Sequence, residues 1–186
     1  MHTISLYWLP ILASAAAVWV ASAVIWMALP HHKKDVSKLP DEDGFRGFVK
    51  SASIPPGSYM FPFCDSHSAA GKAEMKAKWE SGPTGILRVW GKVNMGRNMA
   101  LTFLVFLAVS YLIAYLLGSS GVEPSATFAM KFKLAGTAGI LAYCFSFIPN
   151  GIWFGQSGRA IAMTIVDGVI YGLVTGAVFA ALWPGH

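Results

Sequence analysis

Four long stretches with almost no charged residues limit what this chain can fold into. They are residues 4–29, 99–118, 132–149 and 160–183, and only Lys133 and Asp167 carry a charge within them. About 20 apolar residues in an α-helix cross a hydrocarbon core of about 30 Å. Because a helix satisfies its own backbone hydrogen bonds in lipid, we expect four membrane-spanning helices. The sequence therefore predicts an all-α membrane protein, built on a four-helix transmembrane bundle.

The composition agrees with this interpretation and argues against a nucleic-acid-binding protein. Only 12% of the residues are charged, compared with about 25% in soluble proteins. The net charge of +5 comes from basic residues gathered in one loop, whereas a nucleic-acid-binding protein spreads them over a folded face. We therefore expect the chain to be surrounded by the lipid bilayer, with no nucleic acid as a partner.

The polar stretch of residues 30–98 is expected to form a small α+β subdomain between the first two spans. It holds 11 of the 14 Lys and Arg residues and seven of the nine acidic residues. Pro40 and the three acids after it predict a helix start, and a second helix is expected at 69–79. Residues 59–63 and 86–90 are expected to pair as short strands. The predicted domains are the first helix at 1–29, this loop at 30–98 and three helices within 99–186.

The distribution of Lys and Arg predicts how the chain lies across the membrane, because flanks rich in these residues stay in the cytoplasm. The long loop and Arg159 carry 12 of them, and the opposite side carries only Lys131 and Lys133. We therefore expect residues 30–98 in the cytoplasm and both termini outside. The basic loop should also attract anionic lipid headgroups.

Asp167 is the main candidate for a functional residue within the spans. If the fourth helix starts at residue 160, this carboxylate lies about 10 Å from the start of the helix. An ionised group at that depth is costly unless it is paired or hydrated. One interpretation is a proton or cation relay, or a contact with a partner's basic group, with Asn150 as a second polar residue on the path. The alternative is a later helix start, which leaves Asp167 at the headgroups with Arg159 or Lys92 as its partner.

Small residues recur at four-residue spacing in the fourth span and in the first. They are Gly168, Gly172 and Gly176, and Ala13, Ala17 and Ala21. Such stripes allow two helix backbones to approach closely. We expect the two stripes to pack against each other within one chain. The alternative is that the glycines contact a second copy of the chain or another membrane protein.

Four side chains of the loop are candidate metal ligands, namely His31, His32, Cys64 and His67. Imidazole and thiolate groups suit zinc and similar ions. The spacing differs from that of known zinc sites, because there is a single Cys-x-x-His pair and neighbouring histidines do not easily reach one ion. The preferred interpretation is a basic collar that faces the membrane, and no cofactor is expected.

Five segments of the chain have sequences that can be compared with a known group of proteins. They lie at residues 27–35, 56–62, 81–90, 135–138 and 149–155. They resemble the corresponding parts of a group of small bacterial inner-membrane proteins for which no activity is known. The resemblance covers most of the chain. It implies a bacterial origin, a location in the inner (cytoplasmic) membrane and four transmembrane helices, and it implies no functional residues.

Common catalytic motifs are missing from the sequence, including Gly-x-Ser-x-Gly, His-Glu-x-x-His and a phosphate-binding glycine-rich loop. We therefore expect a non-catalytic integral membrane protein: an accessory, assembly or scaffolding subunit of a membrane complex, with other membrane proteins or further copies of itself as partners. The alternative is an oligomeric transporter or channel for ions or small solutes that uses Asp167. A membrane enzyme that uses the histidines and the cysteine of the loop is a third interpretation, with an incomplete set of ligands.

Overall fold

The chain is mostly helical and divides into two compact units. The computed structural model describes residues 4–65, 72–123 and 125–184. One unit contains Met1–Val36 and Asn94–His186, and the other contains Ser37–Val93. Four helical segments are long and apolar enough to cross a membrane, at Trp8–Ala28, Met95–Ser119, Phe128–Trp153 and Gly158–Leu182. The prediction of a mostly helical chain with four such segments and a small sheet is confirmed.

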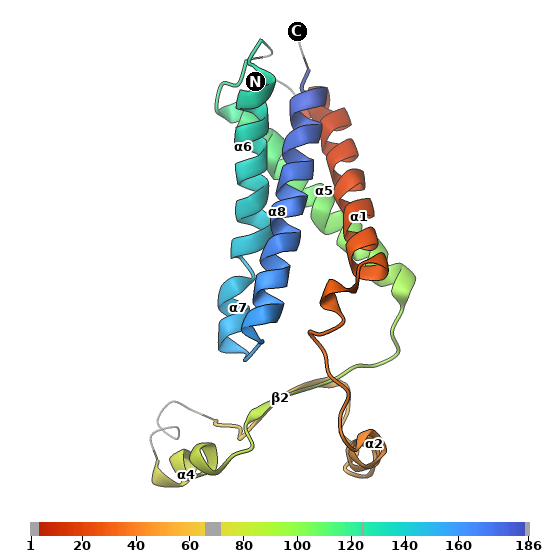
Figure 1. Cartoon of the computed structure of the whole chain (residues 1–186), viewed down its shortest axis with the longest axis vertical. Helices are drawn as coiled ribbons and strands as arrows, with labels where there is room; N and C mark the ends of the chain where they lie inside the picture. The colour runs from red at the N-terminus through yellow and green to blue at the C-terminus, as the bar shows by residue number, and fades with distance from the viewer. Residues whose placement is uncertain (1–3, 66–71, 124, 185–186) are drawn as a thin grey trace. The chain divides into compact units, whose positions relative to one another are not determined.

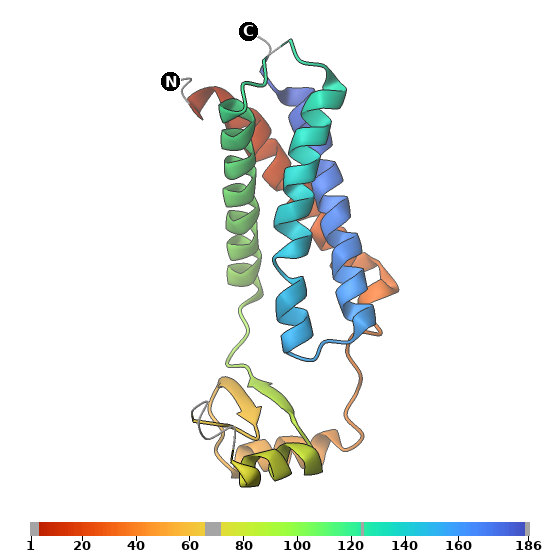
Figure 2. The ribbon, with the colours of Figure 1, turned by 90° about the vertical axis from the view of Figure 1, so that its left-hand side faces the viewer.

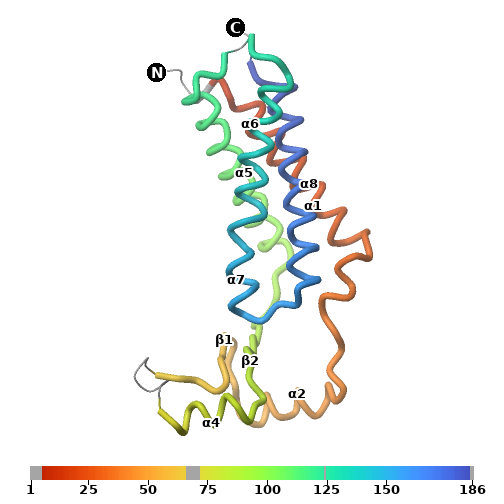
Figure 3. Tube along the Cα trace, turned by 60° about the vertical axis from the view of Figure 1, so that its left-hand side comes forward, coloured from red at the N-terminus to blue at the C-terminus, as the bar shows by residue number. Residues whose placement is uncertain are grey.

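The first unit consists of these long helices and their short extensions (Figure 1). In chain order they are η1 (Ile4–Tyr7), α1 (Trp8–Ala28), η2 (Pro30–His32), α5 (Met95–Ser119), α6 (Phe128–Ile140), η3 (Leu141–Phe145), α7 (Ile148–Trp153) and α8 (Gly158–Leu182). Helix α8 lies between α6 and α1 and contacts both, and α5 contacts α1. Helix α1 begins and α8 ends at the same end of this unit (Figure 3).

Three of the long helices begin earlier than the sequence predicted. Side-chain caps define their starts, whereas the prediction used the points where charged residues give way to apolar ones. The side chain of Asn94 accepts a hydrogen bond from the backbone N–H of Arg97 at the start of α5. Thr127 caps α6 and Ser157 caps α8 in the same way. A cap satisfies N–H groups that have no partner within the helix. Each first turn therefore includes residues that the sequence analysis assigned to loops.

The third membrane-length segment differs from the predicted span at 132–149. Helix α6 passes into η3, which is a π-helical turn, and then into α7. Pro149 lies in the first turn of α7, where its missing N–H needs no acceptor. Pro149 therefore starts a helical segment, whereas the sequence analysis placed it at the end of one.

The glycines of α8 pack against α6 and η3, which corrects the predicted contact with the alanines of α1. A Cβ atom added to Gly172 would lie 2.6 Å from the backbone N of Ile140, and one added to Gly176 would lie 3.0 Å from Cα of Gly136. A Cβ atom on Gly168 would meet the sulfur of Cys144 at 2.5 Å. The reason is that α6 has glycines of its own at this contact, so both backbones can approach.

The alanines of the predicted stripe on α1 are only half-buried. Ala13, Ala17 and Ala21 have intermediate exposure. The buried face of α1 is instead formed by Pro10, Ile11, Ser14, Ala15, Val18 and Ile25. Helix α1 therefore packs against α5 and α8 mainly through larger side chains than the stripe predicted.

The second unit contains two short helices and a two-stranded antiparallel sheet. Its elements are α2 (Glu42–Ser51), β1 (Gly57–Phe61), α4 (Ala73–Ser81) and β2 (Gly85–Val89). The strands are antiparallel, with Tyr59 opposite Leu87, and both are drawn as arrows in Figure 2. Asp41 caps α2 by accepting a hydrogen bond from the N–H of Gly44. The predicted short helices and the pairing of the two strands are confirmed.

Candidate functional site

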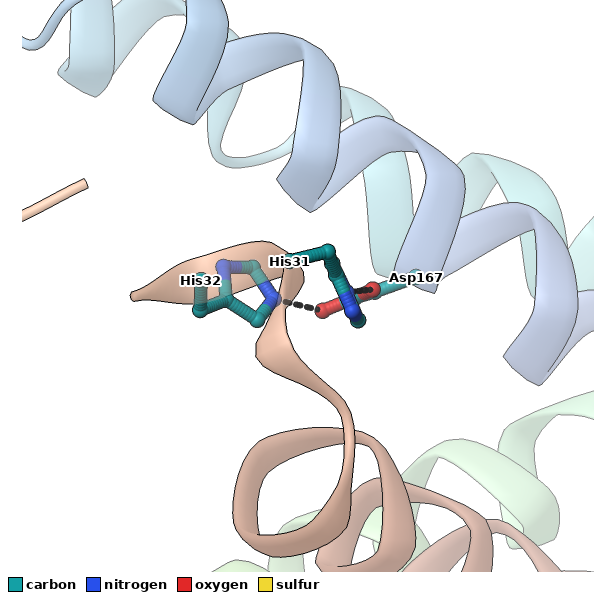
Figure 4. A group of neighbouring side chains, drawn as sticks. All are labelled: His31, His32 and Asp167. Atoms are coloured by element: carbon teal, nitrogen blue, oxygen red, sulfur yellow. Dashed lines mark hydrogen bonds and ion pairs between the residues drawn. The ribbon is translucent and has the colours of Figure 1, made fainter. Parts of the chain in front are cut away.

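A buried cluster of histidines and carboxylates forms around Asp167 in the first unit (Figure 4). Asp167 is the tenth residue of α8 and only 3% of its surface is exposed. Its Oδ1 lies 3.0 Å from Nε2 of His31, and its Oδ2 lies 2.7 Å from Nε2 of His32. Both oxygens of this carboxylate therefore have an imidazole partner.

The two histidines reach Asp167 because of the turn that follows α1. Leu29 has an extended backbone that ends α1, and Pro30 then starts the short helix η2, as its fixed φ favours. This turn brings the two imidazoles together, with ring centroids 4.2 Å apart and planes tilted by 42°. The expectation that neighbouring histidines do not reach one point is therefore wrong for this turn.

His32 lies between two carboxylates. Its Nδ1 lies 2.7 Å from Oδ2 of Asp35, and its ring stacks on Trp26 with a centroid distance of 3.9 Å. An ionised carboxylate only accepts hydrogen bonds, so both ring nitrogens must donate when both acids are ionised. Burial alone would lower the pKa of His32, but the hydrogen bonds and charges of Asp35 and Asp167 raise this pKa above its ordinary value.

Arg159 completes the cluster on the side of Asp35. Its guanidinium forms an ion pair with Asp35 and donates a hydrogen bond to the backbone oxygen of His31. The alternative derived from the sequence, with a late helix start and Arg159 beside Asp167, is wrong. Helix α8 begins at Gly158, so Arg159 lies two turns before Asp167 and pairs with a different acid.

This arrangement has two chemical consequences. The cluster joins residues 31–35 to α8 through hydrogen bonds and ion pairs in a mostly buried setting, where such contacts resist screening by salt. It also points two imidazole nitrogens and two carboxylate oxygens at one place. Such a set of donors and acceptors can hold a positive charge, either as protons on histidine or as a bound cation.

The other residues singled out in the sequence lie elsewhere. Asn150 is exposed in α7 and takes no part in the hydrogen bonds of the cluster. Cys64 is half-buried and belongs to the unit Ser37–Val93. His67 lies outside the described residues. The structure thus brings together His31, His32, Asp167 and Arg159 from the predicted set.

Two members of the cluster were not identified from the sequence. Asp35 follows His32 by three residues, and Trp26 lies in the last turns of α1. The spacing of His32 and Asp35 is the signal that would have found this acid, because a turn after Pro30 brings residues three apart together. No sequence signal distinguishes Trp26 from an ordinary aromatic residue of the membrane interface.

No protein-family model, curated protein or solved structure matches this chain.

Proposed function

We propose that this chain is a multi-pass protein of the bacterial inner membrane that serves a larger membrane complex as a non-catalytic accessory subunit. In this proposal the unit Ser37–Val93 lies in the cytoplasm and binds the partner, and both termini lie outside. The excess of Lys and Arg in residues 30–98 supports this orientation. The resemblance noted above supports the bacterial inner membrane.

One observation about the unit Ser37–Val93 carries the proposal: none of its described residues is buried. Its exposed side chains include Phe48, which is 60% exposed, and Trp90, which is 78% exposed. A two-stranded sheet is at best marginally stable without a further surface to pack on. Large exposed apolar surfaces commonly mark protein or membrane contacts. This unit therefore has the properties of a docking module whose core is completed by another molecule.

A cleft in this unit indicates the chemistry of the partner. The cleft has a volume of about 410 Å³ and lies between α2 and β2. Its lining residues are Phe45, Arg46, Val49, Lys50, Ser53, Ile54, Leu87, Arg88 and Val89. Apolar side chains and three basic groups thus face one space. They suit an amphipathic segment of a partner protein that has apolar residues flanked by acidic ones.

Charge reversal in the cleft tests this function. The full chain, expressed at its native level and purified in a gentle detergent, is expected to retain a defined, stoichiometric set of membrane subunits. The double variant Lys50→Glu with Arg88→Glu should lose them. The matched control Lys38→Glu with Lys76→Glu, which changes the charge by the same amount at exposed positions outside the cleft, should keep them. Purification of the wild type without any partner, or equal retention by both double variants, contradicts the proposal.

A second candidate function is an oligomeric transporter or channel that uses Asp167, and one observation favours it. Five hydroxyl groups are buried among the described residues of the long helices, those of Ser14, Ser110, Tyr143, Tyr171 and Thr175. The hydroxyls of Ser110 and Thr175 lie close to that of Tyr143. Tyr171 and Thr175 follow Asp167 at four-residue spacing on α8, so polar groups continue from the cluster into the helices. Ion flux in proteoliposomes that depends on Asp167, and is lost in Asp167→Asn, would support this candidate over the accessory role.

A further inference from the structure

We propose that His31, His32 and Asp167 form a binding site for a divalent transition-metal ion, for which zinc is the best-suited example. The site lies in the unit of long helices, so the inference is independent of the docking role proposed for the unit Ser37–Val93.

The three side chains present their ligand atoms to a common point. One atom from each residue, an imidazole Nε2 or a carboxylate oxygen, lies within 4.8 Å of the other two. Zinc binds nitrogen and oxygen at about 2.0–2.2 Å, and two ligands of a tetrahedral zinc ion lie about 3.3 Å apart. The observed separations from Asp167 are 3.0 Å for His31 and 2.7 Å for His32. The two contacts run to different oxygens of Asp167, so an ion would enter as these contacts lengthen by a few tenths of an ångström and as the side chains rotate to face one centre.

The surrounding contacts are those that support a metal-binding histidine. A ligating histidine usually donates its second N–H to a carboxylate, which fixes the ring and its tautomer. In this chain Nδ1 of His32 lies 2.7 Å from Asp35 and Nε2 faces Asp167. Asp35 is itself held by Arg159. Trp26, stacked on the His32 ring, limits its rotation further.

The identity of the ligands indicates the class of ion. Two imidazoles and one carboxylate suit first-row transition metals, whereas calcium and magnesium prefer oxygen ligands. Three protein ligands with a fourth position for water are typical of zinc sites that remain open to exchange. Asp167 and Asp35 supply two negative charges beside neutral imidazoles, and Arg159 offsets the charge of Asp35. The burial of a divalent cation is therefore compensated in part, chiefly by Asp167.

The competing explanation is a purely structural ion pair, in which protons on the histidines balance the carboxylates. The two states differ at Nε2 of His32, which either carries a proton and donates a hydrogen bond to Asp167 or binds the metal through its lone pair. Only the metal-binding state predicts that an added ion binds and that this binding depends on both His31 and His32. Direct metal binding therefore separates the two explanations.

The test uses the full chain in detergent, purified with a tag that contains no histidine and stripped of metal with a chelator. After equilibrium dialysis against Zn²⁺, the wild type should retain about one zinc ion per chain. His31→Gln and Asp167→Asn should each lower the affinity by at least about tenfold, and Asp35→Asn should lower it roughly 10- to 100-fold. The control, Cys64→Ser with His67→Gln, should bind zinc as the wild type does.

Cobalt provides a second readout, because Co²⁺ reports its ligands through its absorption spectrum. The wild type should show d–d bands of a nitrogen- and oxygen-bound ion, with no thiolate-to-cobalt charge-transfer band, and His31→Gln should change these bands. Thiolate charge transfer, or loss of binding in the control variant, would assign the metal to Cys64 and overturn the proposal. Absence of stoichiometric zinc, or equal binding by wild type and His31→Gln, would also overturn it. The side chain of His31 is 23% exposed, so His31→Gln decides the question even if Asp167→Asn does not fold.

Discussion

Nε2 of His32 lies 2.7 Å from Oδ2 of Asp167, although 135 residues separate them in the chain. This contact joins the turn after α1 to the middle of α8. The turn that follows one membrane-length helix therefore meets a second such helix at a buried polar contact, where a missing partner is costly.

Removal of the Asp167 carboxylate should destabilise the protein strongly. Asp167→Ala leaves both histidines without their buried acceptor, and the loss of one partner of a buried ion pair costs about 3–5 kcal/mol. The measurement is the free energy of unfolding in detergent. As a control, Asp43→Ala removes a carboxylate that is 97% exposed, and it should change this free energy by less than about 0.5 kcal/mol. Equal effects of the two substitutions would show that the cluster does not stabilise the fold.

The stability of the metal-free protein should fall as the pH rises. The pKa of His32 is above its ordinary value of 6.5 in the folded protein, so the folded state binds the proton more tightly than the unfolded state. This stabilisation is fully present below pH 6.5 and is lost as the pH rises through the folded-state pKa. Thermal unfolding in the presence of a chelator measures it. His32→Gln should flatten the pH dependence, and an unchanged profile in this variant would exclude His32 as its origin.

A single methyl group at the α6–α8 contact should also destabilise the protein. A Cβ atom on Gly172 would lie 2.5 Å from Cγ1 and 2.6 Å from the backbone N of Ile140. We expect Gly172→Ala to cost about 1–3 kcal/mol, because the two backbones must separate. Gly158→Ala, at the first residue of the same helix, places its added Cβ more than 4 Å from every atom beyond its chain neighbours and the adjacent helix backbone and should be tolerated. Similar melting temperatures for both variants would contradict the close contact.

The proposed orientation can be tested with reporter fusions. A reporter at either terminus should be active on the outer side of the membrane, and one inserted after Gly82, in the turn between α4 and β2, should be active in the cytoplasm. The physical reason is the retention of Lys- and Arg-rich flanks on the cytoplasmic side. A cytoplasmic signal from the terminus at His186 would reverse the orientation and move the proposed docking unit to the other side.

Much of the secondary structure could be predicted from the sequence, because its signals are local. Charge-free runs of about 20 residues suffice to identify membrane-length helices. Residues 59–63 and 86–90 were expected to pair as short strands, and the structure pairs β1 with β2, with Tyr59 opposite Leu87. The helix starts were less accurate, since Asn94, Thr127 and Ser157 cap their helices ahead of the apolar runs.

The candidate site was predicted only in part. Asp167 was identified because a carboxylate in an apolar run is costly and needs a partner. His31 and His32 were not identified as its partners, because their chemistry alone placed them with Cys64 and His67 as candidate metal ligands. Asp35 was missed because its role depends on the turn at Pro30, which places it beside His32.

The order of residues alone dictates that most of this chain avoids water and that one acid within an apolar stretch requires compensation, because both follow from the transfer free energies of the residues. Which helices pack together, and which groups compensate Asp167, was decided only by the tertiary structure. The atoms nearest to the glycines of α8 belong to α6 and η3, and not to the alanine stripe of α1 that was predicted, because close packing depends on the shapes of two surfaces. The histidines meet Asp167 because the end of α1 and the middle of α8 lie side by side, and no local pattern encodes that proximity.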